Sequence, residues 1–225
     1  MAEMSSAGGT APAGLSREQE EAAFYHEAAL NTAWTGTRLL IGVVTSGLGA
    51  FIFAFFYLRS LNSHNEWNPA SFPGLKQWAG AVVMGLIVVS AAVQTAGLSR
   101  IKAGRRGDWL AAATVALALG VVAAAIQIWE LTALSFQPGY SGLASVFVGA
   151  SPVLAALVLA SMIRLEILLV RGRQIPEISF VEQPPTFTEA AAVQRFQAAL
   201  SGFTLFWNFM AIAAVVFWVL LYLVQ

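Results

Sequence analysis

Five long uncharged stretches dominate the hydrophobic pattern of this chain after residue 38. They are 20 to 33 residues long and cover residues 39–58, 77–99, 109–129, 131–163 and 196–225. The hydrocarbon core of a bilayer is roughly 30 Å thick, and about 20 apolar helical residues cross it. The pattern therefore predicts an all-α protein, a polytopic membrane bundle of five transmembrane helices.

Turn signals between the stretches refine their bounds. Pro138-Gly139 predicts a tight turn at residues 137–140, which divides the 131–163 stretch. We expect the third span to run from Trp109 to about residue 134 and the fourth to end near Val170. Residues 171–195 are then the longest loop, and the fifth span follows them.

The segment before the first span divides into two parts. Residues 1–14 are small and polar, which predicts a disordered tail. Residues 15–34 are predicted to form an amphipathic helix at the membrane surface. Ser16 can cap its first turn. Its loose apolar face consists of Phe24, Tyr25, Leu30 and Trp34. A solvated helix that precedes the first span fits this pattern equally well. Residues 35–225 form the membrane domain.

Composition narrows the chemistry that this chain can perform. Only 11 % of its residues are charged, against about 25 % in soluble domains. It has no cysteine, which excludes disulfides and thiol chemistry, and its zero net charge offers no basic surface to nucleic acid. Its two histidines, His26 and His64, lie outside the five stretches, so no histidine is placed to bind a haem inside the membrane. We expect no cofactor in this chain.

Basic residues predict the orientation of the bundle. Ten of the twelve Lys and Arg residues fall on one side of the predicted membrane, and Arg59 and Lys76 fall on the other. Because cytoplasmic loops carry an excess of Lys and Arg, we expect the N-terminus in the cytoplasm and the C-terminus outside.

A few polar residues lie within the apolar stretches, where a polar group is costly and usually has a role. Glu130 follows Gln127 by three residues, so both lie on one helical face. Glu130 either binds a partner helix or lipid, or reaches water beside Trp129. Asn208 is central in the last span, and we expect it to join helices. The same interpretation applies to Gln94 and Thr45. No pair of groups suited to catalysis occurs, so an enzyme acting alone is not expected.

Small residues in the first two spans predict a surface for close helix packing. They are Gly42, Gly47, Ala50, Gly80, Gly85 and Ser90. We expect this surface to contact a partner protein.

Four segments resemble subunit III of the haem-copper oxidases, the cytochrome c oxidase subunit III family, in its short five-helix bacterial form. The first is Phe53-Ala54-Phe55-Phe56-Tyr57-Leu58-Arg59 followed by Trp67-Asn68-Pro69, and the second is Gln127-Ile128-Trp129-Glu130 followed by Tyr140-Ser141-Gly142. The third is Leu168-Leu169-Val170-Arg171-Gly172, and the fourth is Phe206-Trp207-Asn208-Phe209, with Tyr222 beyond it. The resemblance covers residues 38–225 in order.

The chain also departs from this family. It has no acid in Val44-Thr45-Ser46-Gly47, no paired histidines in the fourth span, and Asn208 in place of a histidine. Most of the titratable groups that the family buries are therefore absent, whereas Glu130 remains.

The resemblance implies a non-catalytic subunit that stabilises the catalytic subunit of a terminal oxidase in aerobic respiration. Haem and copper would then lie in that partner, phospholipid would bind between helices, and the location would be the bacterial plasma membrane. Alternatives are an accessory subunit of a nitric oxide reductase or another respiratory complex, or a small transporter or lipid-binding scaffold. The candidate residues for contact with a partner or lipid are Gln127, Glu130, Trp207, Asn208, Gly47 and Gly80.

Overall fold

The structure is a computed structural model that describes residues 17–62, 66–175, 180 and 187–224. Its helices are α1 (Arg17–Ser60), α2 (Gln77–Lys102), α3 (Arg106–Thr132), α4 (Gly142–Gln174), α6 (Phe187–Trp218) and the short π-helical turn η1 (Val219–Leu223). Five of these helices are long and apolar enough to cross a membrane. The prediction of an all-α protein with five transmembrane helices is confirmed, and the described residues contain no strand.

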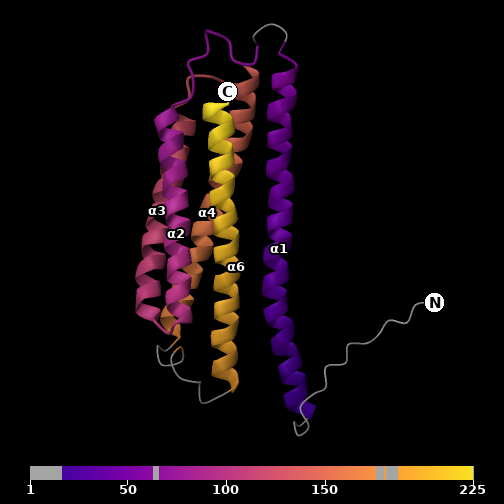
Figure 1. The fold of residues 1–225 in the computed structure, drawn as a ribbon, viewed down its shortest axis with the longest axis vertical. Coiled ribbons are helices and arrows are strands. Elements are labelled where there is room, and N and C mark those ends of the chain that lie inside the picture. Colours follow the sequence, from indigo (N-terminus) through magenta and orange to yellow (C-terminus); the bar gives the residue numbers. More distant parts are fainter. Residues whose placement is uncertain (1–16, 63–65, 176–179, 181–186, 225) are drawn as a thin grey trace, which may run out of the picture.

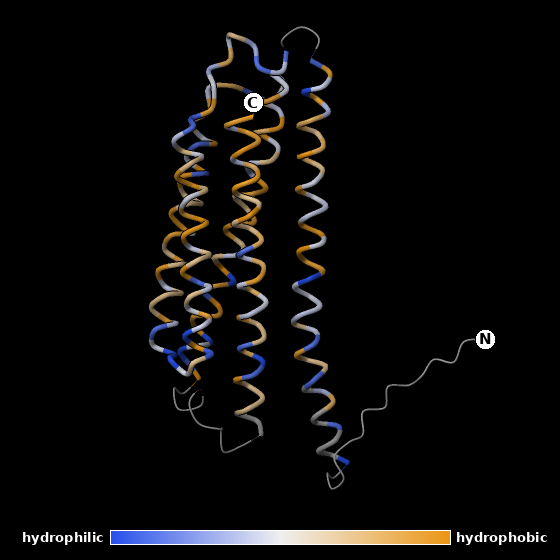
Figure 2. Tube along the Cα trace, viewed as in Figure 1, coloured by the Kyte–Doolittle hydropathy of each residue, from blue (hydrophilic) through white to orange (hydrophobic). Residues whose placement is uncertain are grey.

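The five long helices run side by side, and the start of α1 and the end of η1 lie at opposite ends of the bundle (Figure 1). Helices α2, α3, α4 and α6 form a compact group, whereas α1 packs against α4 and α6. Gly202 permits this contact, since a Cβ atom there would lie 2.5 Å from Thr37 Oγ1. Figure 2 shows hydrophobic residues along most of each long helix and a cluster of hydrophilic residues where α2 meets α3.

The turn predicted between the third and fourth spans is confirmed. The Tyr140 N–H donates to the Gln137 carbonyl at 3.2 Å, and Gly139 has a φ of 90°, which glycine adopts without strain. Ser141 then caps α4, because its hydroxyl accepts from the Ala144 N–H at 3.0 Å. These contacts explain why α4 begins at Gly142.

Helix α1 continues across the boundary that the sequence suggested at residue 34. It extends unbroken from Arg17 to Ser60. From residue 17 onward, the predicted surface helix and the first span are therefore one continuous helix. The residues between Arg17 and Trp34 include good helix formers, and no Pro interrupts them. The predicted tail at residues 1–14 lies outside the described residues.

Helix α4 is longer than the sequence predicted, and the loop after it is shorter. The helix ends at Gln174 rather than near Val170, and α6 begins at Phe187 rather than Phe196. Arg106 accounts for the first difference. Its Nε donates to the Gly172 carbonyl at 2.8 Å and its Nη2 donates to the Arg173 carbonyl at 2.7 Å. A cation that satisfies terminal carbonyls stabilises the last turn of a helix.

Candidate functional site

The buried carboxylate of Glu130 is held by the far end of the chain. The Tyr222 hydroxyl lies 3.0 Å from Oε1 and 3.1 Å from Oε2 of this carboxylate. Glu130 is only 4 % exposed, whereas its neighbour Trp129 is 45 % exposed. The carboxylate therefore faces the interior of the bundle, and the interpretation that it reaches water beside Trp129 is wrong.

Three further contacts position Tyr222. Its ring lies over Gly80 of α2, where an added Cβ atom would overlap the ring. Gln77 Nε2 donates to the Tyr222 carbonyl at 3.2 Å, and the ring meets Phe147 of α4 edge-on at 6.1 Å. Tyr222, which lies in η1, thus contacts α2, α3 and α4. Sequence analysis placed Gly80 on a partner surface, but this glycine is buried under a side chain of its own chain.

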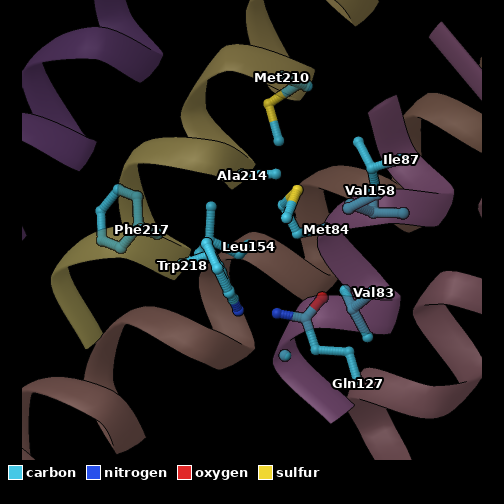
Figure 3. A pocket seen from close by; sticks show the side chains of 11 residues that line it. Val83, Met84, Ile87, Gln127, Leu154, Val158, Met210, Ala214, Phe217 and Trp218 are labelled. Atoms are coloured by element: carbon cyan, nitrogen blue, oxygen red, sulfur yellow. The ribbon is translucent and has the colours of Figure 1, made fainter. Parts of the chain in front are cut away.

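Gln127 does not bond to Glu130, although the two residues share a face of α3. Its Nε2 donates instead to the Ser151 carbonyl of α4 at 3.2 Å. Its Oε1 is buried without a hydrogen-bond partner, and so is Nε1 of Trp218. The two side chains line a cavity of about 50 Å³ between α2, α3, α4 and α6, which Figure 3 shows to be otherwise apolar. Ligand sites typically measure about 300–1,000 Å³, so this cavity is too small for an organic substrate.

Trp207 is the central residue of a second set of hydrogen bonds between helices. It is completely buried, and its Nε1 donates to the Ser90 hydroxyl at 3.1 Å. Ser90 in turn donates to the Ala116 carbonyl at 2.8 Å. This relay connects α6 to α2 and α2 to α3. Neither Trp207 nor Ser90 lies on the bundle surface, in contrast to the partner contact that the sequence suggested for them.

Asn208 joins α6 to α2, as the sequence predicted. Its Nδ2 donates to Thr95 Oγ1 at 3.0 Å, on the outer side of the two helices. Gln94 Nε2 lies 3.5 Å from Thr204 Oγ1 of α6, and this second pair is buried inside the bundle. Thr45 behaves differently, since its hydroxyl donates to the Ile41 carbonyl of its own helix at 2.7 Å. The prediction that Thr45 joins helices is therefore wrong.

The small residues of the first two spans do not form one surface. Gly42, Gly47 and Ala50 are exposed on α1. Nothing lies within 4 Å of a Cβ atom added to either glycine. Gly80 and Ser90 are buried on α2. Helix α1 packs against α4 and α6, whereas α2 packs against α3 and α6, so the sequence-based surface is divided between separate faces.

The connection between α1 and α2 links two further helices, through Trp67. The Trp67 carbonyl accepts from the Leu143 N–H at 3.2 Å, and the neighbouring Glu66 carbonyl accepts from Gly142 at 3.2 Å. The Trp67 indole meets the Phe55 ring edge-on at 4.9 Å. The loop therefore satisfies free amides at the start of α4 and ties this helix to the end of α1.

A groove between α1, α4 and α6 has a volume of about 250 Å³, which is larger than that of the cavity beside Gln127. Its walls include Thr37 of α1, Ser161 and Arg164 of α4, and Phe203 of α6. Both hydroxyls donate to carbonyls of their own helices, at 3.0 Å from Thr37 and 2.7 Å from Ser161. Arg164 is exposed and is the cation of the groove. Sequence reasoning missed this groove because a hydropathy pattern does not reveal which helices are neighbours.

No group of three His, Asp or Glu side chains within the described residues is arranged to hold a metal ion. The comparison with protein-family models gives no match, and neither does the comparison with curated proteins.

Proposed function

We propose that this chain is a non-catalytic membrane subunit, similar to subunit III, of a haem-copper terminal oxidase. Its role is to stabilise the catalytic subunit during aerobic respiration. The haem and copper lie in that partner, and the complex resides in the bacterial plasma membrane, with the N-terminus of this chain in the cytoplasm.

The observation that carries this proposal is the position of the residues on which the family resemblance rests. Glu130 and Tyr222 meet across α3 and η1, and Trp207 bonds to Ser90 of α2. Trp67 joins the end of α1 to the start of α4. Segments that are far apart in the sequence thus supply interhelical joints rather than groups that converge on a substrate. Such an arrangement supports a scaffold role.

The groove between α1, α4 and α6 favours lipid binding as a second, compatible function. Apolar side chains surround most of this space, and Arg164 supplies one positive charge. Such a lining suits an acyl chain together with an anionic headgroup. Delipidation of the purified chain followed by lipid mass spectrometry tests this function. We expect phospholipid to be retained by the native chain and reduced in Arg164→Leu.

Purification of the affinity-tagged chain from its native membranes in mild detergent tests the main proposal. We expect a reduced-minus-oxidised haem spectrum in the eluate and a haem-copper subunit I among the proteins identified by mass spectrometry. A nitric oxide reductase subunit in its place would favour the alternative respiratory complex. An eluate without a haem protein would reject both and favour a transporter or an independent lipid-binding scaffold.

A further inference from the structure

Asn208 has hydrogen-bonding capacity that the residues described by the structure do not use. Its amide offers two N–H donors and a carbonyl acceptor. One N–H donates to Thr95 Oγ1 at 3.0 Å. The single proton of Thr95 is shared between the Ala91 carbonyl at 2.8 Å and Asn208 Oδ1 at 3.2 Å, and the shorter contact favours Ala91. One N–H and most of the carbonyl capacity of Asn208 therefore remain available.

This amide lies at a depth where lipid offers no hydrogen bond. At a rise of 1.5 Å per residue, Asn208 is roughly 20 Å along α6 from Arg195 at one end and from Tyr222 at the other. Thr95 is exposed and Asn208 is half-buried, so the pair lies on the outer side of the bundle. A polar group left unpaired in hydrocarbon is costly, because no water is present to replace its partner.

Two exposed hydroxyls in the spans bond within their own helices. Thr114 on α3 donates to the Leu110 carbonyl at 2.8 Å, and Ser46 on α1 donates to the Gly42 carbonyl at 3.1 Å. A hydroxyl can bond to the preceding turn of its own helix, whereas an amide with two donors and an acceptor cannot satisfy all of them there. Asn208 therefore differs from these residues in needing a group from outside the chain.

The surface around Asn208 permits the close approach of another helix. On the α2 side the exposed residues next to Thr95 are small, namely Ala92 and Ser99. On the α6 side, Leu205 and Ile212 are 41 % and 65 % exposed. Small residues let helix backbones approach, and a neighbouring row of larger side chains provides packing. A short side chain such as that of Asn208 can then reach a polar group on the incoming helix.

We infer that the face of α2 and α6 around Thr95 and Asn208 is the docking surface for a transmembrane helix of the partner subunit. That helix places a hydrogen-bonding side chain opposite the Asn208 amide. The inference rests on the proposed function, since it assigns the partner of that function to one face of the bundle. Lipid tails fit the same surface sterically but leave the amide unpaired.

A photo-crosslinking amino acid introduced at Ala92 tests the location. The same group at Val122, an exposed apolar residue of α3, is the matched control. In native membranes we expect an adduct between this chain and the haem-bearing subunit from Ala92 and none from Val122. Adducts with that subunit from Val122 or from Gly47, but not from Ala92, would overturn the inference and leave the proposed function intact. Adducts from Ala92 between two copies of this chain would also overturn it.

Two substitutions test the role of the Asn208 amide. Thr95→Val and Asn208→Leu both remove the hydrogen bond between positions 95 and 208, but only Asn208→Leu removes the amide that faces the partner. We expect Asn208→Leu to weaken association with the haem-bearing subunit by roughly three- to thirty-fold, as expected for one interhelical hydrogen bond. Thr95→Val should associate almost normally, and so should Asn208→Gln. Equal losses in Thr95→Val and Asn208→Leu would contradict the inference.

The haem spectrum of the eluate separates the two possible failures. A haem spectrum without an Ala92 adduct rejects only the docking surface. An eluate without haem rejects the proposed function and this partner together, independently of the crosslinking result.

Discussion

Tyr222 and Glu130 are 92 residues apart in the sequence, yet the tyrosine hydroxyl reaches both oxygens of the carboxylate, at 3.0 and 3.1 Å. The last turn of the chain thereby closes onto the third helix. The hydrogen bond is buried, so neither group has water as a replacement partner. Loss of either group should therefore weaken the packing of the C-terminal end.

Substitution of Glu130 tests this contact. Glu130→Leu removes the carboxylate that accepts from the buried Tyr222 hydroxyl, and loss of this hydrogen bond should cost about 1–3 kcal/mol. Glu130→Gln keeps an acceptor oxygen and should lose less. The free energy of unfolding in detergent, followed by circular dichroism, distinguishes the two variants. Equal values for Leu and Gln would show that the carboxylate does not hold the tyrosine.

Gly80 should tolerate no side chain, because the Tyr222 ring occupies the space of a Cβ atom. Gly80→Ala should displace the ring and lower the thermal unfolding temperature. Gly85→Ala, on the same helix, is the control, since nothing lies within 4 Å of the added atom. It should be neutral or slightly stabilising, because alanine favours helix more than glycine does. If Gly80→Ala is as stable as Gly85→Ala, the close packing of α2 and η1 is refuted.

The indole N–H of Trp207 should contribute to the stability of the bundle through its hydrogen bond to Ser90. Trp207→Phe keeps an aromatic ring but loses the bond to Ser90, and it should destabilise the bundle by roughly 1–2 kcal/mol. Trp78→Phe is a suitable control, because Trp78 is 58 % exposed. Unfolding in detergent should show a clear difference between the two variants. Similar stabilities would mean that the relay adds nothing to the packing of α6.

The orientation of the bundle can be tested by labelling, since the natural chain has no cysteine. Gln137 and Ala103 lie in the connections at opposite ends of the bundle and are both exposed. We expect a membrane-impermeant maleimide to modify Gln137→Cys in intact cells and to spare Ala103→Cys until the membrane is opened. The reverse pattern would place the N-terminus outside.

The hydropathy pattern was sufficient to predict the five helices and the turn at Pro138-Gly139. Apolar length and turn residues are local properties, so they can be read from one sequence. The role of Asn208 was also predictable, because a central amide in a span needs a partner helix. Its actual partner, Thr95, was not, since that pairing depends on which helices are neighbours.

The errors in the predicted site have the same physical origin. Gly80 and Ser90 resemble residues of an exposed packing face, but Tyr222 and Trp207 cover them from a distant part of the chain. Gln127 and Glu130 were predicted to lie on one helical face, but this spacing does not reveal what each side chain contacts. A helix within a bundle contacts more than one neighbour, so Gln127 bonds to α4 and Glu130 to η1.

The stability of turnover tests the stabiliser role most directly. Oxygen consumption by the oxidase complex that we propose for this chain should be followed over time with the chain present and after its removal. We expect the same initial rate in both samples, because the proposed function assigns the redox centres to the partner, followed by a faster loss of activity in the sample that lacks this chain. Equally sustained turnover in the two samples would contradict the account.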